Sequence, residues 1–421
     1  MKGEPTTLTL KFPGGLNNRS RENEIPDTAL RVADNLSVTN AGGLLCRKGA
    51  RCVLSGSVHS PFDAGEFLLL VVNGVLSRFD GIGSATSLVT LSYDVPVRYA
   101  SLNGSVYWVT QFERGRIDAS GLVAPWGIET PPQIRAVATT GGLRPGDYWI
   151  TYTAMLPSGL ESGAPAPVSV SLPSGGGINV TVPSGSGVAF NVYLSPPDGT
   201  VDEMRYAIRL LPGAIATVDS PPLGRLLESL LAVRPFTGQA LCAYRGRLWI
   251  GQGSVIWYTS ERSPHWLFPD AGFISTPDQV TLLGAVEDGI YLGTNSAIWF
   301  LAGNDPNEMT MRQVSSVGAV EGTGMTLPDD AFSGEGTSPS TRCAWMDTEG
   351  YFCVGYSGGA VARPTKVAYC AGRHLSGASG FWQYEGLRQA IIVLSDNGIP
   401  AQLSAVDTPL HEINQYGTTL P

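Results

Sequence analysis

Short hydrophobic runs, separated by turns that contain glycine or asparagine, recur along most of this chain. Six stretches have the form strand, turn, strand, and they span residues 66–81, 103–121, 244–260, 287–303, 349–362 and 390–405. Tight turns of this composition between hydrophobic runs are a strong local signal for β-hairpins. The pattern therefore predicts an all-β protein.

The spacing of these hairpins predicts how they are arranged. Equivalent strand positions are Leu69, Trp108, Trp249, Tyr291, Phe352 and Val393, and three of the five intervals are 39, 42 and 41 residues. A period near 40 with four strands per unit is typical of propeller blades, so we expect a β-propeller of about five to seven blades. One long interval contains an extra loop near residues 323–340, and the other contains a whole extra domain.

The extra domain occupies residues 130–222, between an N-terminal docking segment with the first blades (1–129) and a linker with the remaining blades (223–421). Its short alternating strands, with turns every ten or so residues, predict a small β-sandwich. In the stretch GDYWITYTAM, Tyr148, Ile150 and Tyr152 share one strand face by the period of two. The stretch resembles a fibronectin type III or Ig-like module, which implies a spacer or adhesive role.

One segment carries a helical pattern instead. From Pro222 to Val233 the leucines fall at i, i+3, i+4, i+7 and i+8, as Leu223, Leu226, Leu227, Leu230 and Leu231. This spacing predicts an amphipathic helix of two to three turns. It would be a linker helix packed under the propeller or, alternatively, a subunit-interface helix.

The N-terminal region contains a long ordered motif. It runs from a turn-rich entry with Gly15, Asn17 and Asn18, through a helix-like run at 27–35, to a strand–turn–strand over residues 36–52. The order G-L-N-N, P-D-x-A-L-R-x-A-x-N-L-x-V-T, G-x-L resembles the opening of tail nozzle proteins of tailed bacteriophages, also described as packaged-DNA stabilisation proteins. The resemblance implies a β-propeller that docks as a six-fold ring on an adaptor or tail-tube ring. The strand–turn–strand is then a candidate strand pair of the first blade.

Charge is unevenly distributed. The chain has a net charge of −9; residues 1–55 hold eight Lys/Arg and five Asp/Glu, which gives +3 there and −12 for the remainder. An acidic body argues against nucleic-acid binding and suits a conduit that DNA crosses without binding. The basic N-terminal cluster is either a solvated face or a docking surface for an acidic partner subunit, and it comprises Arg19, Arg21, Arg31, Arg47, Lys48 and Arg51.

Patterns with catalytic potential are weak. Ser357 lies in a G-x-S-x-G sequence that Asp407 and His411 follow, but the residues after it read as a turn and a strand rather than the helix of a nucleophile elbow. The four histidines are scattered, and the oxygen-rich stretches 304–308 and 321–330 lack the order of a calcium loop. We therefore expect no enzymatic activity, no cofactor and no metal.

Six cysteines show no zinc spacing, and neither a signal peptide nor a membrane span is evident. We expect a protein made in the host cytoplasm that becomes part of the virion tail. The leading hypothesis is a ring-forming tail nozzle that retains and guides DNA during ejection. A host-receptor or glycan-binding tail protein is the alternative, and a hydrolase that uses Ser357 ranks third.

Overall fold

The computed structural model describes residues 11–34, 36–39, 41–46, 52–81, 83–184, 188–327, 341–384, 387–396, 412–414 and 419–420. Within these ranges the secondary structure is β-strand, apart from three-residue 3₁₀ helices at Glu22–Glu24, Val201–Glu203 and Ser357–Gly359. No helix in this part of the chain is long and apolar enough to cross a membrane. The all-β prediction is confirmed.

In the described residues, six four-stranded antiparallel sheets follow one another along the chain, and in each the strand order equals the chain order. The first sheet contains β3 (Val58–Asp63), β4 (Leu68–Val72), β5 (Val75–Phe79) and β6 (Thr86–Thr90). The second contains β7 (Arg98–Leu102), β8 (Ser105–Val109), β9 (Arg114–Ile117) and β10 (Val123–Ala124). The third contains β18 (Ala240–Tyr244), β19 (Arg247–Gln252), β20 (Val255–Tyr258) and β21 (Phe273–Ser275).

The remaining three sheets follow the third along the chain, and all four lie after the domain inserted at residues 130–222. The fourth contains β22 (Val280–Val286), β23 (Gly289–Thr294), β24 (Ile298–Ala302) and β25 (Thr310–Ser315). The fifth contains β26 (Met325–Leu327), β27 (Arg342–Met346), β28 (Phe352–Gly355) and β29 (Val361–Ala362). The sixth contains β30 (Ser376–Tyr384), β31 (Leu387–Ser395), β32 (Glu412–Asn414) and β33 (Thr419–Leu420).

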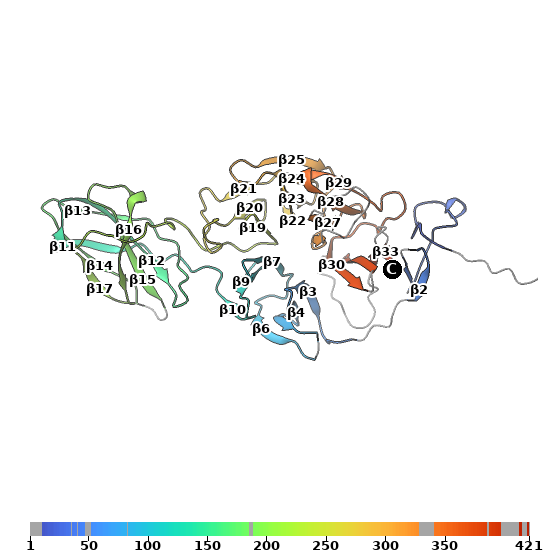
Figure 1. Cartoon of the computed structure of the whole chain (residues 1–421), viewed down its shortest axis with the longest axis horizontal. Helices are drawn as coiled ribbons and strands as arrows, with labels where there is room; N and C mark the ends of the chain where they lie inside the picture. The colour runs from blue at the N-terminus through green and yellow to red at the C-terminus, as the bar shows by residue number, and fades with distance from the viewer. Residues whose placement is uncertain are drawn as a thin grey trace, which may run out of the picture.

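The six sheets surround a common centre in chain order, which is the arrangement of a β-propeller (Figure 1). The first strands of neighbouring sheets contact one another: β7 contacts β18, β18 contacts β22, and β26 contacts β30. Five of the six positions that define the sequence period lie on the second strand of their sheets, namely β4, β8, β19, β23 and β31, whereas Phe352 lies on β28, the third strand of the fifth sheet. The period therefore reflects one repeated sheet.

The core lies between the faces of successive sheets rather than at one centre. Each neighbouring pair, from the first and second sheets to the fifth and sixth, shares its own hydrophobic cluster. On β8, Trp108 packs toward the first sheet, whereas Tyr107 and Val109 pack toward the third. This follows from the period of two along a strand, and it explains why both faces of the second strands are apolar.

The insert is a β-sandwich of seven strands. One sheet has the order β11 (Arg135–Leu143), β14 (Gly176–Thr181), β17 (Ile215–Val218), and the other has β13 (Val168–Leu172), β12 (Gly146–Met155), β15 (Ala189–Leu194), β16 (Arg205–Leu210). A single hydrophobic cluster joins the two sheets and includes Tyr148, Ile150 and Tyr152. The strand order differs from the ABED and CFG sheets of an Ig constant domain.

Three sequence predictions are wrong. Residues 222–233 form no helix; the segment is irregular and makes isolated bridges, Arg205 with Leu226 and Ala164 with Leu230. The N-terminal strand pair, β1 (Leu36–Val38) and β2 (Leu44–Cys46), forms a two-stranded sheet of its own rather than part of the first propeller sheet. The described residues of the 27–35 run also form no helix; they consist of turns and irregular structure with an isolated bridge at Leu30.

Candidate functional site at the N-terminal segment

Residues 11–46, here the N-terminal segment, fold back on themselves before they meet the propeller. Leu16 and Leu30 form a parallel bridge, and the amide of Asn17 donates to the Leu30 carbonyl at 2.8 Å. Leu16 and Ala33 are each 2% exposed and pack with Leu30, Leu36 and Tyr369. Because Tyr369 belongs to the connection after the fifth sheet, this small core attaches the segment to the propeller.

The two asparagines of the motif have distinct roles. Asn17 Oδ1 accepts from the amides of Arg19 (3.1 Å) and Ser20 (3.0 Å), which closes a turn. Asn18 bonds the backbone of Cys370 twice: Nδ2 donates to the carbonyl at 2.9 Å and Oδ1 accepts from the amide at 3.0 Å. An amide side chain is the group that can donate and accept in this way.

The turn of the β1–β2 hairpin requires a glycine at position 42, which the motif supplies. Gly42 has φ +79, and a Cβ there would lie 2.8 Å from the Cδ and the backbone nitrogen of Pro13. The Phe12 amide donates to the Gly42 carbonyl at 2.6 Å, so the start of the segment lies against this turn. Glycine is therefore needed both for its backbone conformation and for close approach.

Three of the six basic residues predicted to form a docking surface are described. Arg19 Nη1 donates to the Tyr351 hydroxyl (2.5 Å) and to the Lys366 carbonyl (2.7 Å), and its guanidinium lies 5.3 Å from the Tyr351 ring centre. Arg31 donates to the Ser20 carbonyl at 2.7 Å, and Arg21 is exposed. Arg47, Lys48 and Arg51 lie outside the described residues. Arg19 and Arg31 thus hold the segment in place.

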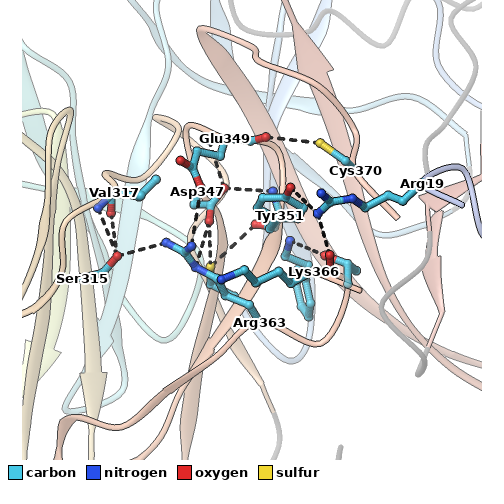
Figure 2. A network of polar contacts seen from close by, with 12 residues as sticks. Arg19, Ser315, Val317, Asp347, Glu349, Tyr351, Arg363, Lys366 and Cys370 are labelled. Atoms are coloured by element: carbon cyan, nitrogen blue, oxygen red, sulfur yellow. Dashed lines mark hydrogen bonds and ion pairs between the residues drawn. The ribbon is translucent and has the colours of Figure 1, made fainter. Parts of the chain in front are cut away.

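Asp347 is the centre of the polar network beneath the segment (Figure 2). Its side chain is 1% exposed; Oδ1 accepts from the amides of Glu349 (3.0 Å) and Tyr351 (2.9 Å), and Oδ2 lies 3.2 Å from Arg363 Nε. Burial raises the pKa of Asp347, although the amides and the Arg363 charge oppose this. Burial likewise raises the pKa of the neighbouring Cys353 thiol well above its usual range.

Arg363 extends this network to the fourth sheet. Its Nη2 donates to Ser315 Oγ at 3.1 Å, and its Nη1 lies 3.5 Å from Glu349 Oε2. Ser315 is the last residue of β25, so the network joins the fourth sheet, the fifth sheet and, through Tyr351, the N-terminal segment. Every oxygen of Asp347 has a partner, and this arrangement orders loops rather than activating a nucleophile.

The five leucines predicted on a helix are not collected on one face. Leu223, Leu226 and Leu231 are exposed, with Leu223 at 93%, whereas Leu227 and Leu230 are half-buried. They lie on the returning linker of the sandwich, which pairs with the sandwich at Leu226 and with the third sheet's connection just after Leu231, through Val233 and Leu267. Leu231 has φ +60, a conformation that no helix residue adopts.

The catalytic patterns do not assemble in the described residues. Ser357 lies in a 3₁₀ turn, and Asp407 and His411 are outside the described residues. Sequence reasoning missed a hydrogen-bonded chain on β3, in which His59 Nε2 lies 2.7 Å from Asp94 Oδ1 and Nδ1 lies 2.9 Å from Ser60 Oγ. The Val97 amide donates to the same Ser60 oxygen at 3.0 Å, so the chain joins β3 to the β6–β7 connection.

The part of the chain that the structure describes contains no group of three or more His, Cys, Asp or Glu side chains that could hold a metal ion. The acid-rich stretch 304–308 is engaged in ordinary contacts. Asn304 Oδ1 accepts from the Tyr244 hydroxyl and from Arg245 Nε, and Asp305 Oδ1 accepts from the Asn307 amide. These contacts are those of a solvated loop.

Comparisons with known proteins do not assign this chain to a family. No family model matches the chain, and no curated protein matches it. Among solved structures, YCF48 bound to D1 peptide is 12% identical, covers 84% of this chain and 94% of its own, and has a TM-score of 0.33. The Dos1 propeller is 8% identical, covers 87% and 81%, and has a TM-score of 0.32. At these scores they carry no argument, and the propeller assignment rests on the six consecutive sheets.

Proposed function

We propose that this chain is a structural subunit of the tail of a tailed bacteriophage, in which copies form a ring at the tail tip that retains and guides DNA during ejection. The observation that supports this is that the residues of the nozzle-like motif form one folded unit on a propeller. Leu16, Asn18 and Gly42 each have a structural role there. A propeller with this entry is the architecture that the resemblance implies.

The charge distribution is compatible with that role. The charge of −12 beyond residue 55 would let DNA pass without binding, because binding requires Lys and Arg to replace phosphate counterions. The proposed partners are other copies of the chain, a hexamer by resemblance, and an adaptor or tail-tube protein. The proposed role requires no catalytic activity and no cofactor.

The proposed docking surface contains four of the six basic residues of the N-terminal cluster. Arg19 and Arg31 bond carbonyls of their own chain, so Arg21, with Arg47, Lys48 and Arg51, would meet an acidic partner subunit. Reversing the charge of Arg21 to Glu should then weaken partner capture without lowering the melting temperature.

Locating the chain in particles tests the proposal. Mass spectrometry of purified virions whose genome encodes this chain should detect it in a fixed copy number, and electron microscopy should place it at the tail tip. A chain that is absent from purified virions would remove the proposal. Light scattering of the purified protein then reports whether a ring forms without its partner.

A host-receptor or glycan-binding role remains the second candidate because the sandwich exposes three large apolar side chains. Val137 on β11, Ile215 on β17 and Leu211 in the turn before β17 are 63%, 67% and 72% exposed. Binding of the isolated protein to host cells, abolished by Val137→Asp with Ile215→Asp, would favour this role over a nozzle. A nozzle requires no such binding.

A further inference from the structure

Two arginines of β9 lie between the second and third propeller sheets, at the base of the sandwich. Arg114 and Arg116 share one strand face, opposite Val109 and Tyr107 of β8. That face of β8 packs against the third sheet. Both arginines are consequently half-buried in the seam between the two sheets.

Two further groups reach the same seam from distant parts of the chain. His265, in the connection between β20 and β21, has its ring centre 6.0 Å from that of Tyr107. Arg234 belongs to the returning linker of the sandwich. Gly127 of the outgoing linker packs against both, since a Cβ on it would lie 2.8 Å from Arg234 Cβ and 2.9 Å from the His265 carbonyl oxygen.

The positive charges in the seam have little compensation. Glu129 Oε2 lies 3.8 Å from Arg234 Nη2, but this carboxylate is 81% exposed. Asp118, also near Arg116, accepts from the Ser120 and Leu122 amides of its own turn. Across the described ranges, no carboxylate oxygen lies within 4.0 Å of a nitrogen of Arg114 or Arg116.

Polar atoms in the seam are also left without partners. Within the described residues, Arg116 Nε and His265 Nδ1 are buried and have no hydrogen-bond partner. Burial and the Arg234 charge lower the pKa of Arg114 to about 10, and burial and the Arg116 charge lower that of His265 to about 4. A buried polar group without a partner is costly, so such a site gains stability from an anion.

We propose that this seam binds a small tetrahedral oxyanion such as phosphate, held by Arg114, Arg116 and Arg234. Guanidinium groups match phosphate geometry and bind it through paired N–H donors. The half-buried position favours a small anion over a nucleic-acid duplex, whose phosphates are contacted by exposed cations. The bound anion joins the second sheet to the returning linker and so stiffens the base of the sandwich.

Titration of the full-length protein with inorganic phosphate tests this proposal without reference to the tail. Calorimetry and thermal unfolding are run at constant ionic strength with chloride as the reference anion. Wild type should bind phosphate with a Kd below about 1 mM, and its melting temperature should rise with phosphate concentration. A weaker Kd, or no rise, overturns the proposal.

Variants locate the site. Arg114→Gln and Arg116→Gln should each weaken phosphate binding at least tenfold, whereas Arg135→Gln, an exposed arginine on β11, should leave it unchanged. If either seam variant fails to fold, Arg234→Gln on the exposed linker replaces it and must weaken binding as well. Equal affinity in the seam variants and in Arg135→Gln, or acetate binding as tight as phosphate, overturns the assignment.

Discussion

Single residues of the N-terminal motif show why a long, ordered pattern exists there. Asn17 closes a turn, Asn18 bonds both backbone groups of Cys370, and Gly42 permits the approach of Pro13. Asn17 and Gly42 are required by contacts within the N-terminal segment, whereas Asn18 contacts a residue 352 positions away. The motif could be recognised from sequence, but its contacts could not.

Replacing Asn18 tests this role. Asn18→Ala removes two hydrogen bonds to Cys370 and should lower the free energy of unfolding by about 1–2 kcal/mol. Hydrogen exchange of residues 12–34 should accelerate in the same variant. Asn18→Asp keeps the acceptor and loses the donor, so its effect should be intermediate. Unchanged exchange in Asn18→Ala would contradict the assigned role.

His265 should make stability depend on pH. Burial, with the Arg116 charge, lowers its folded pKa from 6.5 to about 4, so the folded state binds fewer protons than the unfolded state between these values. The stabilisation is therefore present above pH 6.5 and is lost as the pH falls through about 4.

Denaturant unfolding at several pH values measures this effect. His265→Gln should flatten the dependence of the unfolding free energy on pH between 6.5 and 4. His374→Gln is the matched control, since that ring contacts Asp396 at 2.6 Å outside the seam. Parallel curves for wild type and His265→Gln would show that the His265 environment is not as described.

At the scale of elements, local sequence patterns predicted the strands correctly, but they predicted a helix in the linker at residues 222–233, where none forms. At least one strand of each of the six sheets was recognisable because apolar runs and tight turns are local properties. The leucine pattern at 222–233 has helical spacing, yet its backbone finds partners in the sandwich: the Tyr206 amide donates to the Arg225 carbonyl, and the Leu231 amide to the Ala164 carbonyl. Short isolated helices are marginal, so these tertiary bonds prevail.

The close packing of the fourth and fifth sheets at Gly284 can be tested by substitution. A methyl on Gly284 of β22 would overlap Cys343 Sγ and lie 3.0 Å from Cys343 Cβ, because the fourth and fifth sheets meet there. Gly284→Ala should lower the free energy of unfolding by about 1–3 kcal/mol through overpacking. Gly380→Ala on β30, where a Cβ meets nothing within 4 Å, should change it by less than about 0.5 kcal/mol. Similar losses in both variants would contradict the packing.

For the whole molecule, the sandwich is an insertion whose two ends meet. Thr130 Oγ1 donates to the Ala232 carbonyl at 2.9 Å, and the Trp126 indole donates to the Pro264 carbonyl at 2.7 Å. The buried carboxylate of Glu161 adds a further tie: it accepts from the Tyr193 hydroxyl (2.8 Å) and Asn191 Nδ2 (3.0 Å), and the Trp266 indole donates to its backbone carbonyl at 2.8 Å. The second sheet can therefore continue directly into the third without the sandwich.

Removing the sandwich tests this independence. A short Gly-Ser linker in place of residues 131–231 should leave a propeller that unfolds cooperatively, with a melting temperature within several degrees of the parent. Circular dichroism and calorimetry of the shortened chain measure this. Loss of cooperative unfolding would show that the sandwich is required for the ring of sheets.

The sequence by itself determined the strand class, the repeated hairpin and the position of the insert, because strand period and turn chemistry depend on near neighbours. Only the tertiary structure decided that the Leu223–Leu231 segment is not helical and that Arg19 bonds its own chain. It also brought Arg114, Arg116, Arg234 and His265 close together. Arg234 and His265 are distant from Arg114 and Arg116 in the chain, and the charges of these residues interact strongly only because sheet packing excludes water from between them.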